Sequence, residues 1–198
     1  KAPMMGTAED VFCGNVTGTF TVLEQAGQAG VRRAVVSSSY SVLGLTFAPT
    51  MHHPAYLPID EQVPLQVEDP YAHSKQVDEL TAALRLPYLG GIADTIRARA
   101  ERIAIDPGFG TAAREFWSYL EIRDAARACV LALTEPPAGC HVVTVVSPNT
   151  LAPYPTEQLL DAYHADVPRR RAFPGRTAPF DLSRAHDLLH FTAEFLWE

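Results

Sequence analysis

The sequence predicts an α/β fold with a doubly wound parallel sheet and a small C-terminal lobe. Two observations predict this class. Short runs rich in β-branched residues alternate with longer segments of helical periodicity, and such alternation is typical of parallel sheets that helices cover on both faces. The chain has 198 residues, of which 47% are hydrophobic, so it can bury one sizeable core. Neither an internal repeat nor a low-complexity linker interrupts it.

The first helix is expected over residues 8–26. Thr7 and Asp10 have the spacing of a capping box, in which each side chain binds a backbone N–H at the helix start. Gly14 and Gly18 are poor helix formers, which indicates that another backbone packs closely against this helix. An apolar stripe at helical spacing consists of Phe12, Val16, Phe20 and Leu23.

A buried parallel strand is predicted at residues 31–36, which are rich in β-branched side chains. The run ends at Ser37, Ser38 and Ser39, and an irregular, proline-rich loop follows at residues 44–68. Ligands of open α/β sheets bind beyond the carboxyl ends of the strands, where these hydroxyls are expected. A serine there can hydrogen-bond a carbonyl or alcohol oxygen. Because serine is also common in turns, a plain strand-to-loop transition is the alternative.

A helix over about residues 70–85 comes next. Asp69 and Pro70 are typical of an N-cap and a first helical position. Tyr71 and Lys75 are four residues apart and therefore share one face of this helix.

The pairing of Tyr71 with Lys75 favours acid–base chemistry. With seven tyrosines and two lysines in 198 residues, this spacing arises by chance about 0.07 times. An ammonium beside a phenol favours the phenolate, so such a tyrosine can give or accept a proton near neutral pH. A surface helix that carries one tyrosine and one lysine is the alternative. Serines at a strand end, followed by this pair at a helix start, favour the catalytic interpretation.

The rest of the chain continues the alternation, although residues 86–115 are ambiguous between helix and loop. The elements expected there and beyond are a helix within 92–103, a turn at 107–110, strands at 116–122 and 141–146, and helices at 124–133, 156–164 and 183–189.

Six segments of the chain, in this order, resemble those of a known family: residues 15–19, 37–44, 58–61, 71–75, 119–133 and 181–185. They resemble the extended short-chain dehydrogenase/reductases, also called NAD-dependent epimerase/dehydratases. Leu43 and His190 stand where that family usually has a tyrosine and a glycine. The resemblance implies a Rossmann-like fold.

The resemblance also implies a redox site with NAD or NADP as cofactor. Tyr71 would be the catalytic acid and base, and Lys75 would hold the nicotinamide ribose and tune the tyrosine. Ser39 would orient the reacting hydroxyl or carbonyl of the substrate. Ser37 would border the nicotinamide through its backbone, and Arg176 lies near a position that binds a substrate diphosphate in the family.

Two departures from the family stand out. No Gly-x-Gly-x-x-Gly motif occurs, so the N-terminal βαβαβ half that cradles the pyrophosphate is absent, and we expect it in a segment outside this sequence. A fragment that has lost cofactor binding is the alternative. The stretch between Lys75 and Tyr119 also looks too short for the strand and substrate loop of the family. We therefore expect residues 1–115 to form a partial cofactor-binding domain with the catalytic residues, and residues 116–198 to form the remaining strand–helix unit and the substrate lobe.

Three functions remain open. The first is an NAD(P)-dependent epimerase or dehydratase that acts on a sugar or nucleotide-sugar. The second is a dehydrogenase or reductase of a free sugar, uronic acid or other carbonyl compound, because Trp117 and Ser118 stand where UDP-sugar epimerases have a diphosphate-binding arginine. The third is a non-catalytic sensor or scaffold, which the missing glycine motif favours and the retained serine, tyrosine and lysine disfavour.

Composition narrows the partners. A net charge of −7 and a pI near 5.5 argue against nucleic acid and anionic membranes. No signal peptide and no apolar span of about 20 residues are found, so we expect a soluble protein. Three widely spaced cysteines suit the reducing cytoplasm, and His52, His53 and His73 lack metal-ligand spacing. From the resemblance we expect a homodimer through the helices that carry Asn15 and Tyr71.

Overall fold

A parallel three-stranded sheet forms the centre of the molecule. Its strands are β1 (Val36–Ser39), β2 (Ala83–Leu86) and β5 (Val142–Thr144), in the spatial order β1–β2–β5. β1 pairs with β2 from Val36↔Ala83 onward, and β2 pairs with β5 from Ala83↔Val142 onward. The computed structural model describes residues 5–80, 83–134 and 139–198.

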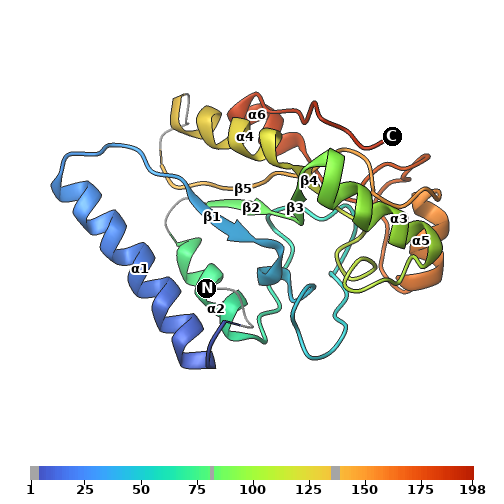
Figure 1. The fold of residues 1–198 in the computed structure, drawn as a ribbon, viewed down its shortest axis with the longest axis horizontal. Coiled ribbons are helices and arrows are strands. Elements are labelled where there is room, and N and C mark those ends of the chain that lie inside the picture. The colour runs from blue at the N-terminus through green and yellow to red at the C-terminus, as the bar shows by residue number, and fades with distance from the viewer. Residues whose placement is uncertain (1–4, 81–82, 135–138) are drawn as a thin grey trace.

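Helices cover the sheet on both sides (Figure 1). On one side lie α1 (Ala8–Gln28) and α2 (Pro70–Asp78), which pack against each other, and α2 also contacts β1. On the other side lie α4 (Ile122–Thr134) and α6 (Ser183–Leu189). The predicted α/β class with a parallel sheet is therefore confirmed.

The remaining elements lie beyond the carboxyl ends of the strands. Two short strands, β3 (Leu89–Gly90) and β4 (Leu120–Glu121), pair in parallel and form a second, two-stranded sheet. The helical elements there are the 3-10 turn η1 (Tyr40–Leu43), the π-helical turn η2 (Ile92–Ile96), α3 (Arg97–Ile105) and α5 (Thr156–Tyr163).

The start of α1 is as predicted, but its packing is not. The Thr7 hydroxyl accepts from the Asp10 amide at 3.1 Å, and the Asp10 carboxylate accepts from the Thr7 amide at 3.1 Å, which completes the capping box. Val11 is the one buried residue among the 21 of this helix. A Cβ added at Gly18 would meet nothing within 4 Å, so the expected close approach of another backbone is wrong at that position.

Two boundaries near the candidate site differ from prediction. The first strand comprises the serines themselves, from Val36 to Ser39, rather than residues 31–36, because pairing with β2 fixes its extent. The second helix ends at Asp78 rather than near residue 85, and residues 83–86 form the central strand β2. Helix-favouring Ala and Leu side chains are extended there because tertiary pairing overrides intrinsic propensity. The stretch after Lys75 thus does hold a strand.

The strand expected at 116–122 is reduced to Leu120 and Glu121. Phe116 and Trp117 instead have φ values of 55° and 53°, in the left-handed region that side chains rarely adopt. Asp124 is not an N-cap; it lies in the first turn of α4, where its carboxylate accepts from the amides of residues 194 and 195. Long-range contacts, which no local pattern records, account for both differences.

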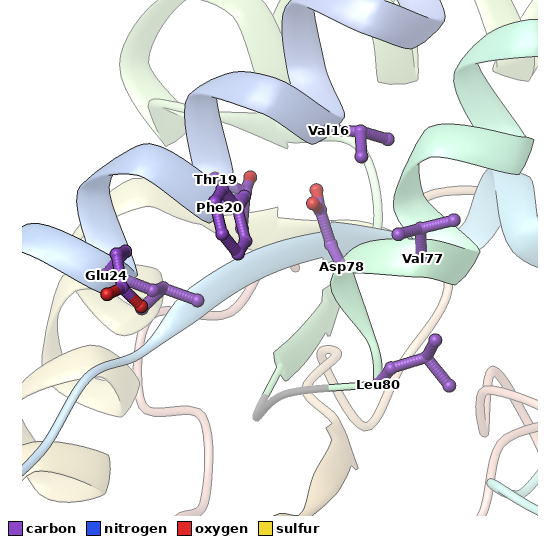
Figure 2. Close-up of a pocket in the computed structure, with 8 residues that line it drawn as sticks. Val16, Thr19, Phe20, Glu24, Val77, Asp78 and Leu80 are labelled. Atoms are coloured by element: carbon purple, nitrogen blue, oxygen red, sulfur yellow. The ribbon is translucent and has the colours of Figure 1, made fainter. Parts of the chain in front are cut away.

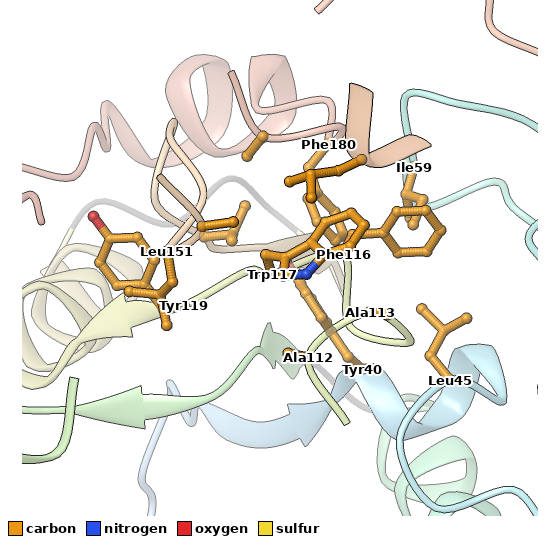
Figure 3. Packing of buried hydrophobic residues seen from close by; sticks show 14 of the residues in the cluster. Tyr40, Leu45, Ile59, Ala112, Ala113, Phe116, Trp117, Tyr119, Leu151 and Phe180 are labelled. Atoms are coloured by element: carbon orange, nitrogen blue, oxygen red, sulfur yellow. The ribbon is translucent and has the colours of Figure 1, made fainter. Parts of the chain in front are cut away.

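An aromatic core fills the region beyond the strand ends (Figure 3). The Trp117 indole N–H donates to the Pro107 carbonyl at 2.7 Å, and the Phe116 ring stacks on His164 with centroids 4.1 Å apart. We call this cluster the aromatic core. Its largest fully buried side chains include Tyr40, Phe116, Trp117, Tyr119, Phe173 and Phe180. Members come from both sides of residue 115, and the division of the chain at that residue stays a prediction.

Two further observations concern the helices. His190, which occupies the family's glycine position, ends α6 with φ 51°, so this side chain occupies a left-handed position that usually favours glycine. Over the described ranges, no helix combines the length and apolar character needed to cross a membrane.

Candidate active site

Lys75 connects α2 to β1. Its ammonium donates to the Ser37 carbonyl at 2.7 Å and to the Asp78 carboxylate at 3.1 Å. The lysine side chain is 14% exposed, so these contacts are largely shielded from bulk water. The structure thus brings together Ser37 and Lys75, two of the residues predicted from the sequence.

Tyr71 lies one helical turn before Lys75. The Lys75 Nζ atom is 5.8 Å from the centroid of the Tyr71 ring, as the i, i+4 spacing predicts. Phe47, from the loop after η1, meets the same ring edge-on with centroids 5.8 Å apart. The loop therefore covers part of the tyrosine while leaving it half-exposed.

Ser39 is the last residue of β1 and the N-cap of η1. Its hydroxyl accepts from the Ser41 amide at 3.2 Å and lies 3.1 Å from the Ser41 hydroxyl. Residues i and i+2 of a strand share a face, so Ser37 and Ser39 lie on the same side of β1. At the other end of η1, Gly44 has φ 72°, and a Cβ there would lie 2.2 Å from the Gln66 carbonyl oxygen. Glycine is required at that position.

Tyr40, which follows Ser39 in the chain, and Tyr71, on α2, differ in burial. Tyr40 is 2% exposed, and burial raises the pKa of its phenol well above its usual range; the Glu61 carboxylate also raises it. A phenol that stays protonated at all ordinary pH values cannot serve as a base near neutral pH. The half-exposed Tyr71 is therefore the better candidate for proton transfer.

A buried ion pair lies between β2 and the residue after α2, next to the serine strand β1. The Arg85 guanidinium, on β2, binds the Glu79 carboxylate through two hydrogen bonds of 2.8 Å. The Ser38 hydroxyl donates to the same carboxylate at 2.7 Å. This bidentate pair links β1, β2 and the residue after α2, which fixes α2 against the serine strand.

The residues predicted for the substrate are engaged in structural contacts. The Arg176 guanidinium donates to the carbonyls of Thr150, at 2.6 Å, and Trp197, at 3.2 Å. Trp117 and Ser118 are both buried at 1% exposure, and the Ser118 hydroxyl donates to a backbone carbonyl at 2.6 Å. In this structure Arg176 therefore anchors the C-terminal segment.

Three contacts of the site were missed from the sequence. Asp78 follows Lys75 by three residues, and this helical spacing is the signal that could have identified the pair. The Asn15 amide donates to the Ser74 hydroxyl at 2.9 Å, which joins α1 to α2 directly behind Tyr71. The ring of Phe47 lies far from Tyr71 in sequence, and no local pattern predicts that contact.

A groove of about 450 Å³ runs between α1 and the end of α2 (Figure 2). It is mostly apolar, and Phe20 and Leu80 on its rim are 66% and 80% exposed. Residues that line it are Val16, Thr19, Phe20, Leu23, Glu24, Val77, Asp78 and Leu80. Three residues of the apolar stripe predicted for the first helix, Val16, Phe20 and Leu23, thus line a groove, whereas Phe12 meets the His73 ring edge-on with centroids 6.4 Å apart.

Comparisons with known proteins place this geometry in context. No protein-family model matches the chain, and no curated protein is similar to it. Solved structures do match. A short-chain dehydrogenase/reductase superfamily protein from Agrobacterium tumefaciens with bound NAD has 21% identity and a TM-score of 0.62, over 99% of this chain and 74% of that one. The chain shares the fold of these enzymes.

Two further structures agree. WbmG of Bordetella bronchiseptica, in complex with NAD and UDP, has 21% identity and a TM-score of 0.60, over 100% of this chain and 64% of that one. UDP-glucose 4-epimerase from Bifidobacterium longum, in complex with NAD⁺ and UDP, has 19% identity and a TM-score of 0.58, over 98% and 70%. The Rossmann-like fold expected from the resemblance is confirmed, and the chain spans about two thirds of the length of these proteins.

Proposed function

We propose that this chain carries the catalytic residues of an NAD(P)-dependent oxidoreductase of the epimerase/dehydratase type, acting on a sugar or nucleotide-sugar. One observation carries the proposal. The Lys75 ammonium binds the carbonyl of Ser37, two residues before the carboxyl end of β1, and lies 5.8 Å from the centroid of the Tyr71 ring. Strand ends are where α/β sheets bind ligands, and a lysine next to a tyrosine is suited to proton transfer.

The residues present fit the nicotinamide–ribose end of NAD or NADP. Two of the three N–H donors of Lys75 bind Ser37 and Asp78, and a third remains for a ribose hydroxyl. The bound cofactor would supply the hydride chemistry at the substrate carbon. Tyr71 would move the proton of the reacting hydroxyl, and Ser39 would orient it. NAD and NADP complexes among the structural neighbours support this choice of cofactor.

Different observations favour two substrate classes for this enzyme. UDP complexes among the neighbours favour a nucleotide-sugar. The contacts of Arg176 with two backbone carbonyls, and the burial of Trp117 and Ser118, favour the second candidate, a dehydrogenase of a free sugar or uronic acid. Such a substrate needs no diphosphate clamp.

The setting of the enzyme is also proposed. A homodimer through α1 and α2 is consistent with the exposed apolar side chains of Phe20 on α1, Val77 on α2 and Leu80 just after it. A cytoplasmic location is consistent with the free cysteines Cys13, Cys129 and Cys140. Sedimentation of the purified protein, with Phe20→Glu as the variant expected to weaken association, would measure the oligomeric state.

The first test is Tyr71→Phe, assayed with NAD or NADP against free sugars, uronic acids and UDP-sugars. Loss of the phenol should lower turnover by about 10²–10⁴-fold, because general acid–base catalysis contributes an acceleration of that size. NADH absorbance and product chromatography distinguish a dehydrogenase, which accumulates NADH, from an epimerase, which does not.

Tyr154→Phe is the matched control, since the Tyr154 hydroxyl donates to the Ala104 carbonyl away from β1. It should retain turnover. Equal turnover of Tyr71→Phe and wild type would contradict the assignment of Tyr71, and a wild type inactive on all substrates with both cofactors would favour the non-catalytic alternative.

A further inference from the structure

Asp78 is an acidic residue in a place that is unfavourable for a carboxylate. It is the last residue of α2 and is 2% exposed. Figure 2 shows its carboxylate rising between α1 and α2, close to Val16 and Val77 on the wall of the groove. Most of the side chains around it are apolar.

Two physical effects oppose an anion there. Burial removes the carboxylate from water, which costs several kcal/mol unless a partner offsets it. The C-terminal end of a helix carries partial negative charge, so the helix dipole also disfavours an acidic side chain in its last turn. A neutral residue would avoid both penalties, so an acid at this position needs a partner that offsets them.

The Lys75 ammonium is the cation that offsets these penalties. Its Nζ atom is 3.1 Å from the Asp78 carboxylate and 2.7 Å from the Ser37 carbonyl. A lysine has four flexible side-chain bonds and loses substantial conformational freedom when it is fixed. Attachment at two points, one on α2 and one on β1, removes that freedom before any ligand arrives.

We propose that Asp78 is a positioning residue of the candidate active site, which holds the Lys75 ammonium against the Ser37 carbonyl of β1 so that its third N–H faces the ligand. The inference rests on the proposed function. In this proposal an ion pair within α2, and not the cofactor, orients the side chain of Lys75. Asp78 touches neither substrate nor cofactor and acts through Lys75.

The test measures proton exchange between the Lys75 ammonium and water. Lys1 and Lys75 are the two lysines of this sequence, so in protein labelled with ¹⁵N-lysine the Lys75 ammonium signal is identified as the one that Lys75→Arg removes. In Asp78→Asn, exchange of the Lys75 ammonium protons with water should accelerate about tenfold, since a charge-assisted hydrogen bond is lost. NAD and NADP affinity, measured by calorimetry, should fall by about the same factor.

Glu24→Gln is the matched control. It removes another carboxylate from the lining of the same groove, and the Glu24 carboxylate accepts from the Gln28 amide rather than from Lys75. Proton exchange at Lys75 and cofactor affinity should stay within twofold of wild type, whereas a general effect of lost negative charge in the groove would change both variants alike. Should Asp78→Asn fail to fold, Asp78→Glu retains the charge while displacing the carboxylate, and it should give the same acceleration.

Unchanged proton exchange in the Asp78 variants would overturn the proposal. Faster exchange with unchanged cofactor affinity would also overturn it, because the ion pair would then serve stability alone. A wild type that binds neither NAD nor NADP, in a polypeptide that includes the expected pyrophosphate-binding half, would instead contradict the proposed function, while the exchange rates would still decide whether Asp78 holds the lysine.

Discussion

The layer of α1 and α2 and the aromatic core differ in how much of their apolar surface they bury. α1 has one buried residue among 21, and its Phe20 is 66% exposed. In the aromatic core, Phe116 and Trp117 are exposed by no more than 1%. Burial of apolar area is the main source of stability, so the aromatic core stabilises this chain far more than the helical layer does.

The candidate site lies where the two regions meet. Ser39 leads directly into η1, whose Tyr40 stacks on Phe180 inside the aromatic core with centroids 5.0 Å apart. Tyr71 and Lys75 lie on α2, in the less buried layer. The buried aromatic core thus fixes the serine, and the residues proposed for proton transfer and cofactor binding lie in the less buried layer. Substitutions should separate stability from chemistry along this boundary.

Trp117→Ala should have the largest effect on stability. It removes a fully buried indole and its hydrogen bond to Pro107, and large aromatic truncations cost about 3–5 kcal/mol. The free energy of unfolding from denaturant titration measures the loss. A loss below about 1 kcal/mol would show that the aromatic core does not dominate stability.

Acidification should cause the second-largest loss of unfolding free energy. Burial lowers the pKa of His164 from 6.5 to about 4, and the Ala113 carbonyl partly opposes this shift. The unfolded chain therefore binds a proton at a higher pH than the folded one, so the stability that neutral His164 contributes is present above pH 6.5 and is lost as the pH falls toward 4. The loss should reach roughly 2–3 kcal/mol.

Unfolding free energies of wild type and His164→Gln between pH 7.5 and pH 4 measure this effect. His53 faces His164 with 3.1 Å between their Nδ1 atoms, and Asp166 and Arg169 lie near enough to influence it. Those groups remain in the variant, so its shallower pH dependence isolates His164. Parallel curves for the two proteins would contradict the assignment.

Phe20→Ser should have the smallest effect. The ring is exposed on the rim of the groove, and exposed substitutions usually change stability by less than about 0.5 kcal/mol. The same denaturant titration, at a protein concentration low enough to keep the chain monomeric, is the measurement. A large loss would mean that the Phe20 ring is buried within the monomer in solution, and would remove the contrast between the two regions.

Local features of the site were predictable because they depend on neighbouring residues. The N-cap at Asp69, with its carboxylate accepting from the Ala72 amide at 2.9 Å, follows from residue type and spacing. The shared face of Tyr71 and Lys75 follows from helix geometry. The alternation of strands and helices gave the α/β class for the same reason.

The sequence by itself determined the fold class, the caps of α1 and α2, and the residues that share a helix face, since each depends on contacts within a few positions. Only the tertiary structure decided that residues 83–86 are a central strand, that Arg176 anchors the C-terminal segment, and that α1 encloses Asp78 beside Lys75. These outcomes depend on pairings between residues far apart in the chain, whose energies outweigh local preference.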